Sequence, residues 1–287
     1  MRRKSFILTL GIMLCTILVV IGVKVFAKPT SHDSITNQNI ATQISSNVNI
    51  TQNLPAFNVL VFSKTAGFRH QSIPAGIAAI RTLGRQNNFR VEASEDATLF
   101  TDTRLSRYQA VIFLNTTGDI LNTSQQAAFR RFIQKGRGFV GIHSATDTEY
   151  NWQWYGRLVG TYFLNHPRPQ RASINVTNST HISTRNLPNR WTRLDEWYNF
   201  RSDPTPNVNV LAKLDESTYS GGRMGKNHPI SWYHVYDGGR AWYTGMGHTS
   251  ESYSEPLFLQ HILGGIRWAA GSTSQQIKLY TPMVSKN

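Results

Sequence analysis

Short apolar runs alternate with amphipathic segments through the first half of the chain. Between residues 73 and 88 the apolar side chains recur at the spacing of one helix face, and this spacing returns from 123 to about 135. The runs between them are rich in β-branched and aromatic residues, as buried strands are, and lie at 57–63, 89–93, 108–115 and 139–142. Strands that alternate with helices in this way predict a parallel sheet covered by helices on both faces.

The pattern changes after a short predicted helix at 152–160. Apolar runs separated by turn residues follow at 171–176, 193–200, 208–214, 230–236 and 240–244. Asp237-Gly238-Gly239 favours a hairpin between the last two runs, and a final amphipathic helix is expected at 256–270. The predicted fold class is α/β, with a mostly parallel sheet and an added antiparallel strand and hairpin region in the C-terminal half.

The early strands end in polar loops at 64–70, 115–119 and 143–149. Right-handed connections gather such loops at one edge of the sheet, where open α/β sheets bind their ligands. The sharpest junction lies within 136–150, where an apolar run gives way to a histidine, hydroxyl groups and two carboxylates. We therefore expect a functional site at this edge.

The first 55 residues differ from the rest in composition. Basic residues at 2–4 precede an uncharged apolar run at 6–23, and small residues before Lys28 suit cleavage. Because the run has a borderline length, residues 1–27 are predicted to be a signal peptide or an N-terminal membrane anchor. Residues 28–55 are rich in Ser, Thr, Asn and Gln and predict a disordered linker. The protein is thus expected to be exported, either secreted or anchored by residues 6–23, with a folded domain at 56–271 and a loose tail at 272–287.

The composition of the chain excludes several kinds of functional site and partner. The only cysteine, Cys15, lies in the N-terminal segment, so the rest of the chain has no thiol nucleophile, disulfide or thiolate zinc site. The net charge of +14 is dispersed and does not form a dense patch, which argues against a nucleic-acid partner. Glycine loops of the kinds that cradle phosphates are absent at the strand ends, which argues against a nucleotide cofactor. The oligomeric state stays open.

Several motifs in the folded region resemble, in the same order, those of the ThuA-like (trehalose utilisation) family. They are Thr117-Gly118-Asp119, the run from Gly138 to Asp147, Phe163 to Pro167, Asp195 to Tyr198, His228 to Trp232 and Gly238 to His248. The resemblance implies a flavodoxin-like sheet related to the class I glutamine amidotransferase fold, and a role in carbohydrate metabolism. Amidotransferases carry a cysteine at the elbow after the strand, where this chain has His143. Glutamine hydrolysis by a thiol is therefore excluded.

The candidate catalytic residues are His143 with Asp147 and Glu149, because either carboxylate could orient the imidazole or hold a ligand hydroxyl. The candidate substrate-binding residues are Gly118, Asp119, His166, Glu196, His228 and His248. If Asp195 and Glu196 lie on a strand they face opposite ways, so only one can reach the site, and the resemblance favours Glu196. No compact metal motif is present, but dispersed histidines can converge on an ion. The candidate ligands for a divalent metal such as zinc are His143, His166 and His248, and no other cofactor is predicted.

Three functions remain open from the sequence. The first is an exported protein that acts on or binds a carbohydrate, a trehalose-type or modified sugar, as a hydrolase, lyase or isomerase with His143 as acid or base. The second is a non-catalytic sugar-binding or envelope-scaffold domain, and the third is a metal-dependent hydrolase. The expected partner is a small sugar, with no nucleic acid, and with membrane contact through the N-terminal segment if that segment is not cleaved.

Overall fold

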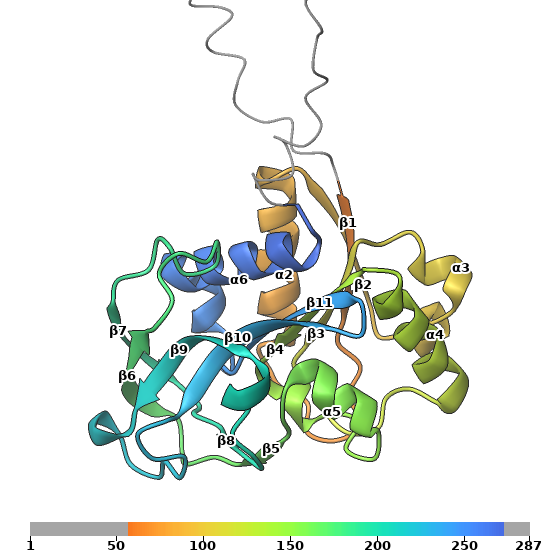
Figure 1. The fold of residues 1–287 in the computed structure, drawn as a ribbon. Helices are drawn as coiled ribbons and strands as arrows, with labels where there is room; N and C mark the ends of the chain where they lie inside the picture. The colour runs from red at the N-terminus through yellow and green to blue at the C-terminus, as the bar shows by residue number, and fades with distance from the viewer. Residues whose placement is uncertain (1–56, 273–287) are drawn as a thin grey trace, which may run out of the picture. The chain divides into compact units, whose positions relative to one another are not determined.

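A nine-stranded sheet forms the centre of the fold, with the strand order β2-β1-β3-β4-β11-β10-β9-β6-β7 (Figure 1). The computed structural model describes residues 57–272. The predicted signal or anchor, the linker and nearly all of the tail lie outside the described residues. Within residues 57–272, no helix is both long enough and apolar enough to span a membrane.

One half of the sheet is parallel, as the alternating pattern predicts. Its central strands β3 and β4 are buried along their whole length, which explains why they read as unbroken apolar runs. The parallel strands are β1 (Phe57–Phe62), β2 (Phe89–Ser94), β3 (Ala110–Leu114), β4 (Gly138–Ile142) and β11 (Gly239–Thr244).

The other half is antiparallel, which confirms the expected change of pattern. Its strands are β10 (Pro229–Tyr236), β9 (Asn209–Asp215), β6 (Gln170–Val176) and β7 (Arg190–Asp195). The hairpin before β11 turns through Asp237 and Gly238, which both have positive φ. The run predicted as one strand at 193–200 is divided. It forms the end of β7, a break, and then β8 (Asn199–Phe200), which pairs with β5 (Phe163–Asn165) in a separate small sheet.

Helices cover both faces of the sheet (Figure 1). One face carries α2 (Ile73–Gln86) and α6 (Pro256–Ala269), and the other carries α3 (Asp102–Leu105), α4 (Thr123–Gln134) and α5 (Gln153–Val159). The N-cap of α4 is Asn122, and Gln125 completes a capping box with it. Single-turn helices complete the described chain: η1 (Ala97–Leu99), η2 (His143–Asp147), η3 (Thr205–Asn207), η4 (Glu216–Thr218) and η5 (Glu251–Ser254).

The topology brings distant strand ends together. Strands β1, β4 and β11 are parallel, so their carboxyl ends share one edge of the sheet. Four antiparallel pairings separate β7 from β11, and four reversals point β7 toward the same edge. In a flat sheet these two strands would lie about 19 Å apart, at about 4.8 Å per pairing. The Gly247 amide nevertheless donates to Asp195 at the end of β7 at 2.8 Å, so the antiparallel half curls back over the site.

Candidate functional site

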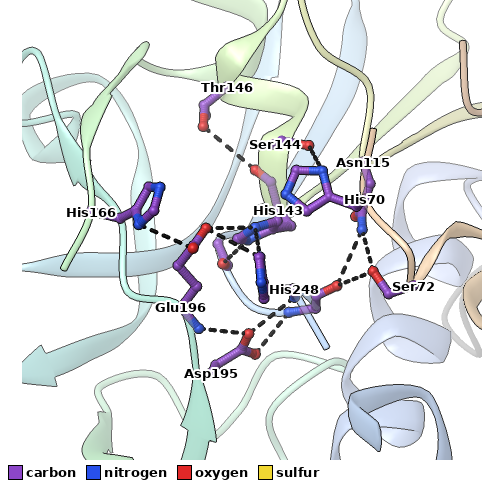
Figure 2. Close-up of polar contacts among 12 residues, drawn as sticks. His70, Ser72, Asn115, His143, Ser144, Thr146, His166, Asp195, Glu196 and His248 are labelled. Atoms are coloured by element: carbon purple, nitrogen blue, oxygen red, sulfur yellow. Dashed lines mark hydrogen bonds and ion pairs between the residues drawn. The ribbon is translucent and has the colours of Figure 1, made fainter. Parts of the chain in front are cut away.

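Four side chains from four separate segments meet at this edge: His70, His143, Glu196 and His248. Each offers one nitrogen or oxygen of the type that binds metals, and these four atoms all lie within 4.8 Å of one another. His70 comes from the loop after β1, His143 from the end of β4, Glu196 from the end of β7 and His248 from the loop after β11. Figure 2 shows the group, which we call the histidine–glutamate cluster.

His143 forms the elbow that the sequence predicts. It follows directly on the last residue of β4, has a φ of +50° and is fully buried. Its Nδ1 lies 2.9 Å from the carbonyl oxygen of Gly245. Because a carbonyl can only accept, Nδ1 carries a proton, and the tautomer that this contact selects has its lone pair at Nε2. That lone pair points into the cluster.

Glu196 is the only anionic member of the cluster. Its Oε2 lies 3.1 Å from Nδ1 of His248 and 3.5 Å from Nε2 of His143. Burial opposes the ionisation of Glu196, but its contacts with the rings of His143 and His248 outweigh burial and hold its pKa below the usual range. The carboxylate is therefore charged inside a nearly closed site.

His248 faces His143 directly, with 3.2 Å between its Nδ1 and Nε2 of His143. Burial works against the charged form of His248, but its hydrogen bond to Glu196 outweighs this and raises the pKa of the ring. The chain reaches this position through Gly247, which has a φ of +111°. A Cβ on that residue would lie 2.8 Å from the Tyr253 hydroxyl, so the turn requires glycine.

His70 closes the cluster from the side of β1. It is buried, and its ring packs edge-on against those of His143 and His248, with centroids 4.9 and 5.1 Å away. Burial and the two neighbouring histidines lower the pKa of His70 to about 3. The ring is consequently neutral at physiological pH, which is the form that binds metals.

The arrangement calls for a cation. The Nε2 lone pair of His143, the Nδ1 of His248 and a carboxylate oxygen face one another at 3.1, 3.2 and 3.5 Å. Without a metal, the proton on Nδ1 of His248 lies between these atoms and is donated to Glu196, and a metal ion could take its place. Ligand atoms about 2.1 Å from a tetrahedral zinc ion lie about 3.4 Å apart, close to these separations. Imidazole and carboxylate ligands suit divalent first-row transition metals.

His166 lies beside the cluster without belonging to it. Its Nδ1 is 3.0 Å from Oε1 of Glu196, the carboxylate oxygen that faces away from His143 and His248 (Figure 2). Its side chain is 40% exposed, compared with 23% for His248. Tyr198 lines the same side, with its ring 4.3 Å from that of His143 and 5.9 Å from that of His166. The site therefore opens to solvent past His166.

Asp147 stands at the end of the η2 turn that His143 begins. Its Oδ1 accepts from the Tyr150 hydroxyl at 2.6 Å, and among the described residues nothing donates to Oδ2. Burial raises the pKa of Asp147, although the Tyr150 hydrogen bond and the nearby His143 act in the opposite direction. A partly buried carboxyl group with one free oxygen can exchange a proton with a ligand.

Glu149 and Gly118, also singled out by the sequence, lie elsewhere. The carboxylate of Glu149 accepts from the amides of Ile120 and Leu121 at 2.9 and 2.7 Å, and from the Gln126 side chain. Its φ of +55° turns it away from the histidines. Gly118 is joined through its backbone to Asp147 and Glu149. These residues hold the loop together, and the structure does not bring them into the cluster.

Asp119 and His228 are the remaining predicted binding residues. Asp119 contacts the side chain of Asn151 at 3.3 Å on the surface. His228 is buried, with its Nδ1 2.7 Å from Glu216 and its Nε2 2.8 Å from the carbonyl of Tyr198. It therefore supports the backbone of the tyrosine that lines the site and does not itself reach the cluster.

Sequence reasoning missed two members of the site. His70 reads only as one of several scattered histidines, although it lies in one of the strand-end loops expected to converge. The alternation expected if Asp195 and Glu196 lie on a strand does not apply, because β7 ends at Asp195. Both residues contribute: Asp195 binds backbone amides beneath the site and Glu196 reaches the histidines.

Comparisons with known proteins agree with this architecture. Residues 58–269 match the family model ThuA, described as trehalose utilisation. A thua-like protein from Bacteroides uniformis is 23% identical, with a TM-score of 0.65 over 76% of this chain and 93% of its own. One from Parabacteroides merdae is 20% identical, with a TM-score of 0.64 over 77% and 92%. A cytoplasmic protein from Salmonella typhimurium is 12% identical, with a TM-score of 0.54 over 74% and 99%. No curated protein matches the chain. At these identities the solved structures show the fold alone.

Proposed function

The chain belongs to the ThuA family, and we propose that it is a metal-dependent enzyme that acts on a carbohydrate outside the cytoplasm. A divalent transition metal binds to His70, His143, Glu196 and His248. The single observation that carries the proposal is the convergence of these four ligand atoms within 4.8 Å. These four residues lie at least 52 positions apart in the sequence, so local chain geometry does not explain their meeting.

The donor set argues for a metal rather than for a bare acid–base pair. In the form that binds a metal, three imidazoles and one carboxylate give a site of net charge −1, which a divalent ion converts to +1. His143 is already held in the tautomer that leaves Nε2 free, because its Nδ1 donates to Gly245. Four protein ligands leave room for one or two further oxygens in a five- or six-coordinate ion.

Those open positions would be filled by oxygens of the substrate. A bound metal supplies Lewis acidity, which polarises a carbonyl or hydroxyl oxygen and favours loss of a neighbouring proton. Asp147, with its free Oδ2, moves that proton, and His166 at the open side holds a substrate hydroxyl. The trehalose-utilisation description of the family supports a sugar as the substrate. Elimination and isomerisation both begin with such a step, whereas hydrolysis would use the polarised oxygen with an attacking water.

The test compares the full chain with two histidine variants. His143→Ala removes a cluster ligand, whereas His234→Ala removes a buried histidine that only donates to the carbonyl of Leu158. Each protein is loaded with Zn²⁺, Co²⁺ or Mn²⁺ and incubated with trehalose and with an oxidised disaccharide, and products are identified by mass spectrometry. We expect turnover by the metal-loaded wild type and by His234→Ala, and none after chelation or in His143→Ala.

The alternative functions give different results in the same experiment. Sugar-dependent thermal stabilisation without any product would favour the non-catalytic binding domain. Turnover that survives exhaustive chelation would contradict the proposed metal dependence, and His143 would then act as a simple acid or base. A wild-type chain that takes up no metal above the level of His143→Ala would overturn the proposal.

A further inference from the structure

Asp195 lies directly beneath the histidine–glutamate cluster and is completely buried. Its Oδ1 accepts from the backbone amides of Glu196 at 2.9 Å and His248 at 3.0 Å. Its Oδ2 accepts from the amide of Gly247 at 2.8 Å. One carboxylate thus binds the backbone of two cluster residues that are 52 positions apart in the chain (Figure 2).

We propose that Asp195 is the positioning residue of this site, and that it sets the distance between Glu196 and His248 before any metal arrives. The inference rests on the metal function proposed above. It does not make Asp195 a ligand or a catalytic residue, because both of its oxygens are occupied by amide N–H groups.

The contact between Asp195 and the His248 amide affects the site strongly because of which ring nitrogen His248 presents. His248 presents Nδ1 to the cluster, and Nδ1 is only three bonds from the Cα atom. Nε2 lies farther from Cα than Nδ1 does, so a histidine that binds through Nε2 can compensate for a backbone shift by rotating its side chain. A histidine that binds through Nδ1 cannot. Any movement of the Gly247–His248 peptide therefore moves the ligand atom almost equally.

The other side of the same peptide is also fixed. The carbonyl of Gly247 lies 3.1 Å from the Tyr253 hydroxyl and 3.3 Å from Nδ2 of Asn115. The amide side depends on Asp195 alone among the described residues, since Asp195 is the acceptor for both Gly247 and His248. Removing that acceptor leaves two buried N–H groups without partners.

Asp195 is itself held by a buried arginine. Nη1 of Arg193 lies 3.0 Å from Oδ2 of Asp195, and Nε of Arg193 lies 3.0 Å from Glu255. Arg193 also donates to the Ser252 hydroxyl at 2.8 Å. The guanidinium thus places a positive charge beside the buried carboxylate whose oxygens accept the three amides.

The experiment measures Co²⁺ affinity and the visible absorption spectrum of bound Co²⁺ in the full chain. Asp195→Asn has nearly the same shape but has one acceptor oxygen in place of two, and its NH₂ group faces an amide donor. We expect Co²⁺ binding to weaken about 10- to 100-fold, as is typical when a group that supports a metal ligand is altered, and the absorption bands to shift.

A matched control separates positioning from general stability. Ile174→Ala removes a fully buried side chain from β6 and should lower the melting temperature of the chain. It should leave the affinity for Co²⁺ within about twofold of wild type and the spectrum unchanged. If Asp195→Asn behaves like Ile174→Ala, the positioning role is wrong, because Asp195 then serves only the fold.

A measurement on the unaltered chain covers the case in which Asp195→Asn does not fold. Amide hydrogen exchange in the metal-free protein should show the amides of Glu196, Gly247 and His248 already protected. Protection that develops only after Co²⁺ is added would overturn the inference and leave the metal site intact. A wild-type chain that binds no Co²⁺ would instead overturn the proposed function.

Discussion

Replacing Glu196 by glutamine is the sharpest single perturbation of the cluster. The change keeps the shape of the side chain and removes the only negative charge among the four ligands. It also puts an NH₂ group or a neutral oxygen 3.1 Å from Nδ1 of His248 and 3.5 Å from Nε2 of His143. A metal ion would then meet three neutral imidazoles and, at best, a weak amide oxygen.

The magnitude follows from ligand linkage. Zn²⁺ at 100 times its dissociation constant stabilises the folded state by about 2.7 kcal/mol. In a domain of this size each kcal/mol shifts the melting temperature by about 2–4 °C, so we expect about 5–11 °C for wild type. Loss of a direct ligand should exceed the 10- to 100-fold cost of altering a supporting group. At the same Zn²⁺ concentration the variant should gain at most about 0.4 kcal/mol, or less than about 2 °C.

The assay is thermal unfolding of the full chain in metal-buffered solution, with and without Zn²⁺. Glu216→Gln is the matched control, because Glu216 also contacts a buried histidine, at 2.7 Å from Nδ1 of His228, but lies outside the cluster. We expect the control to keep the full zinc-dependent shift. The reasoning is refuted if Glu196→Gln is stabilised by Zn²⁺ as strongly as wild type.

Three further predictions concern other parts of the structure. Glu149→Gln should lower the free energy of unfolding by about 1.5–3 kcal/mol, since its carboxylate accepts from the amide of Leu121, while Zn²⁺ affinity measured by titration stays unchanged. Gly247→Ala should cost about 1–3 kcal/mol in backbone strain at its φ of +111° and weaken Zn²⁺ binding; equal binding would contradict the described turn. Burial lowers the pKa of His261 to about 3 and that of His181 to about 4. Below about pH 6.5 these two histidines take up protons in the unfolded chain but not in the folded one. The free energy of unfolding measured in urea should therefore decrease as the pH is lowered, by up to about 2.7 kcal/mol per pH unit between about pH 6 and pH 4. A His181→Asn variant with an unchanged pH slope would contradict that assignment.

Much of the fold could be predicted because burial leaves a clear pattern in a parallel sheet. Strands β3 and β4 are enclosed on both faces and therefore read as unbroken apolar runs. The capping position of α4 and the break after Asp195 were harder to predict, because both depend on one local hydrogen bond. No sequence pattern predicts the curl of the antiparallel half, because the curvature of a sheet arises from the summed twist of many strand pairings.

The site was predicted in part for the same reasons. His143 could be identified because it follows an apolar run directly, and His248 because glycines precede it. Glu196 was a candidate through the family resemblance, whereas His70 lies in a loop whose position relative to β4 depends on topology, so its convergence with the others could be seen only in three dimensions. Glu149 lies outside the cluster, and its positive φ could not be inferred from a glutamate in the sequence.

The central claim is that one metal ion binds within the histidine–glutamate cluster. The most direct measurement is a crystal structure of the full chain grown with Zn²⁺, with anomalous diffraction recorded on both sides of the zinc absorption edge. The account predicts one strong peak about 2.0–2.2 Å from a ring nitrogen of each of His70, His143 and His248 and from the carboxylate of Glu196. A map with no peak there, or with zinc only on surface histidines, would contradict it.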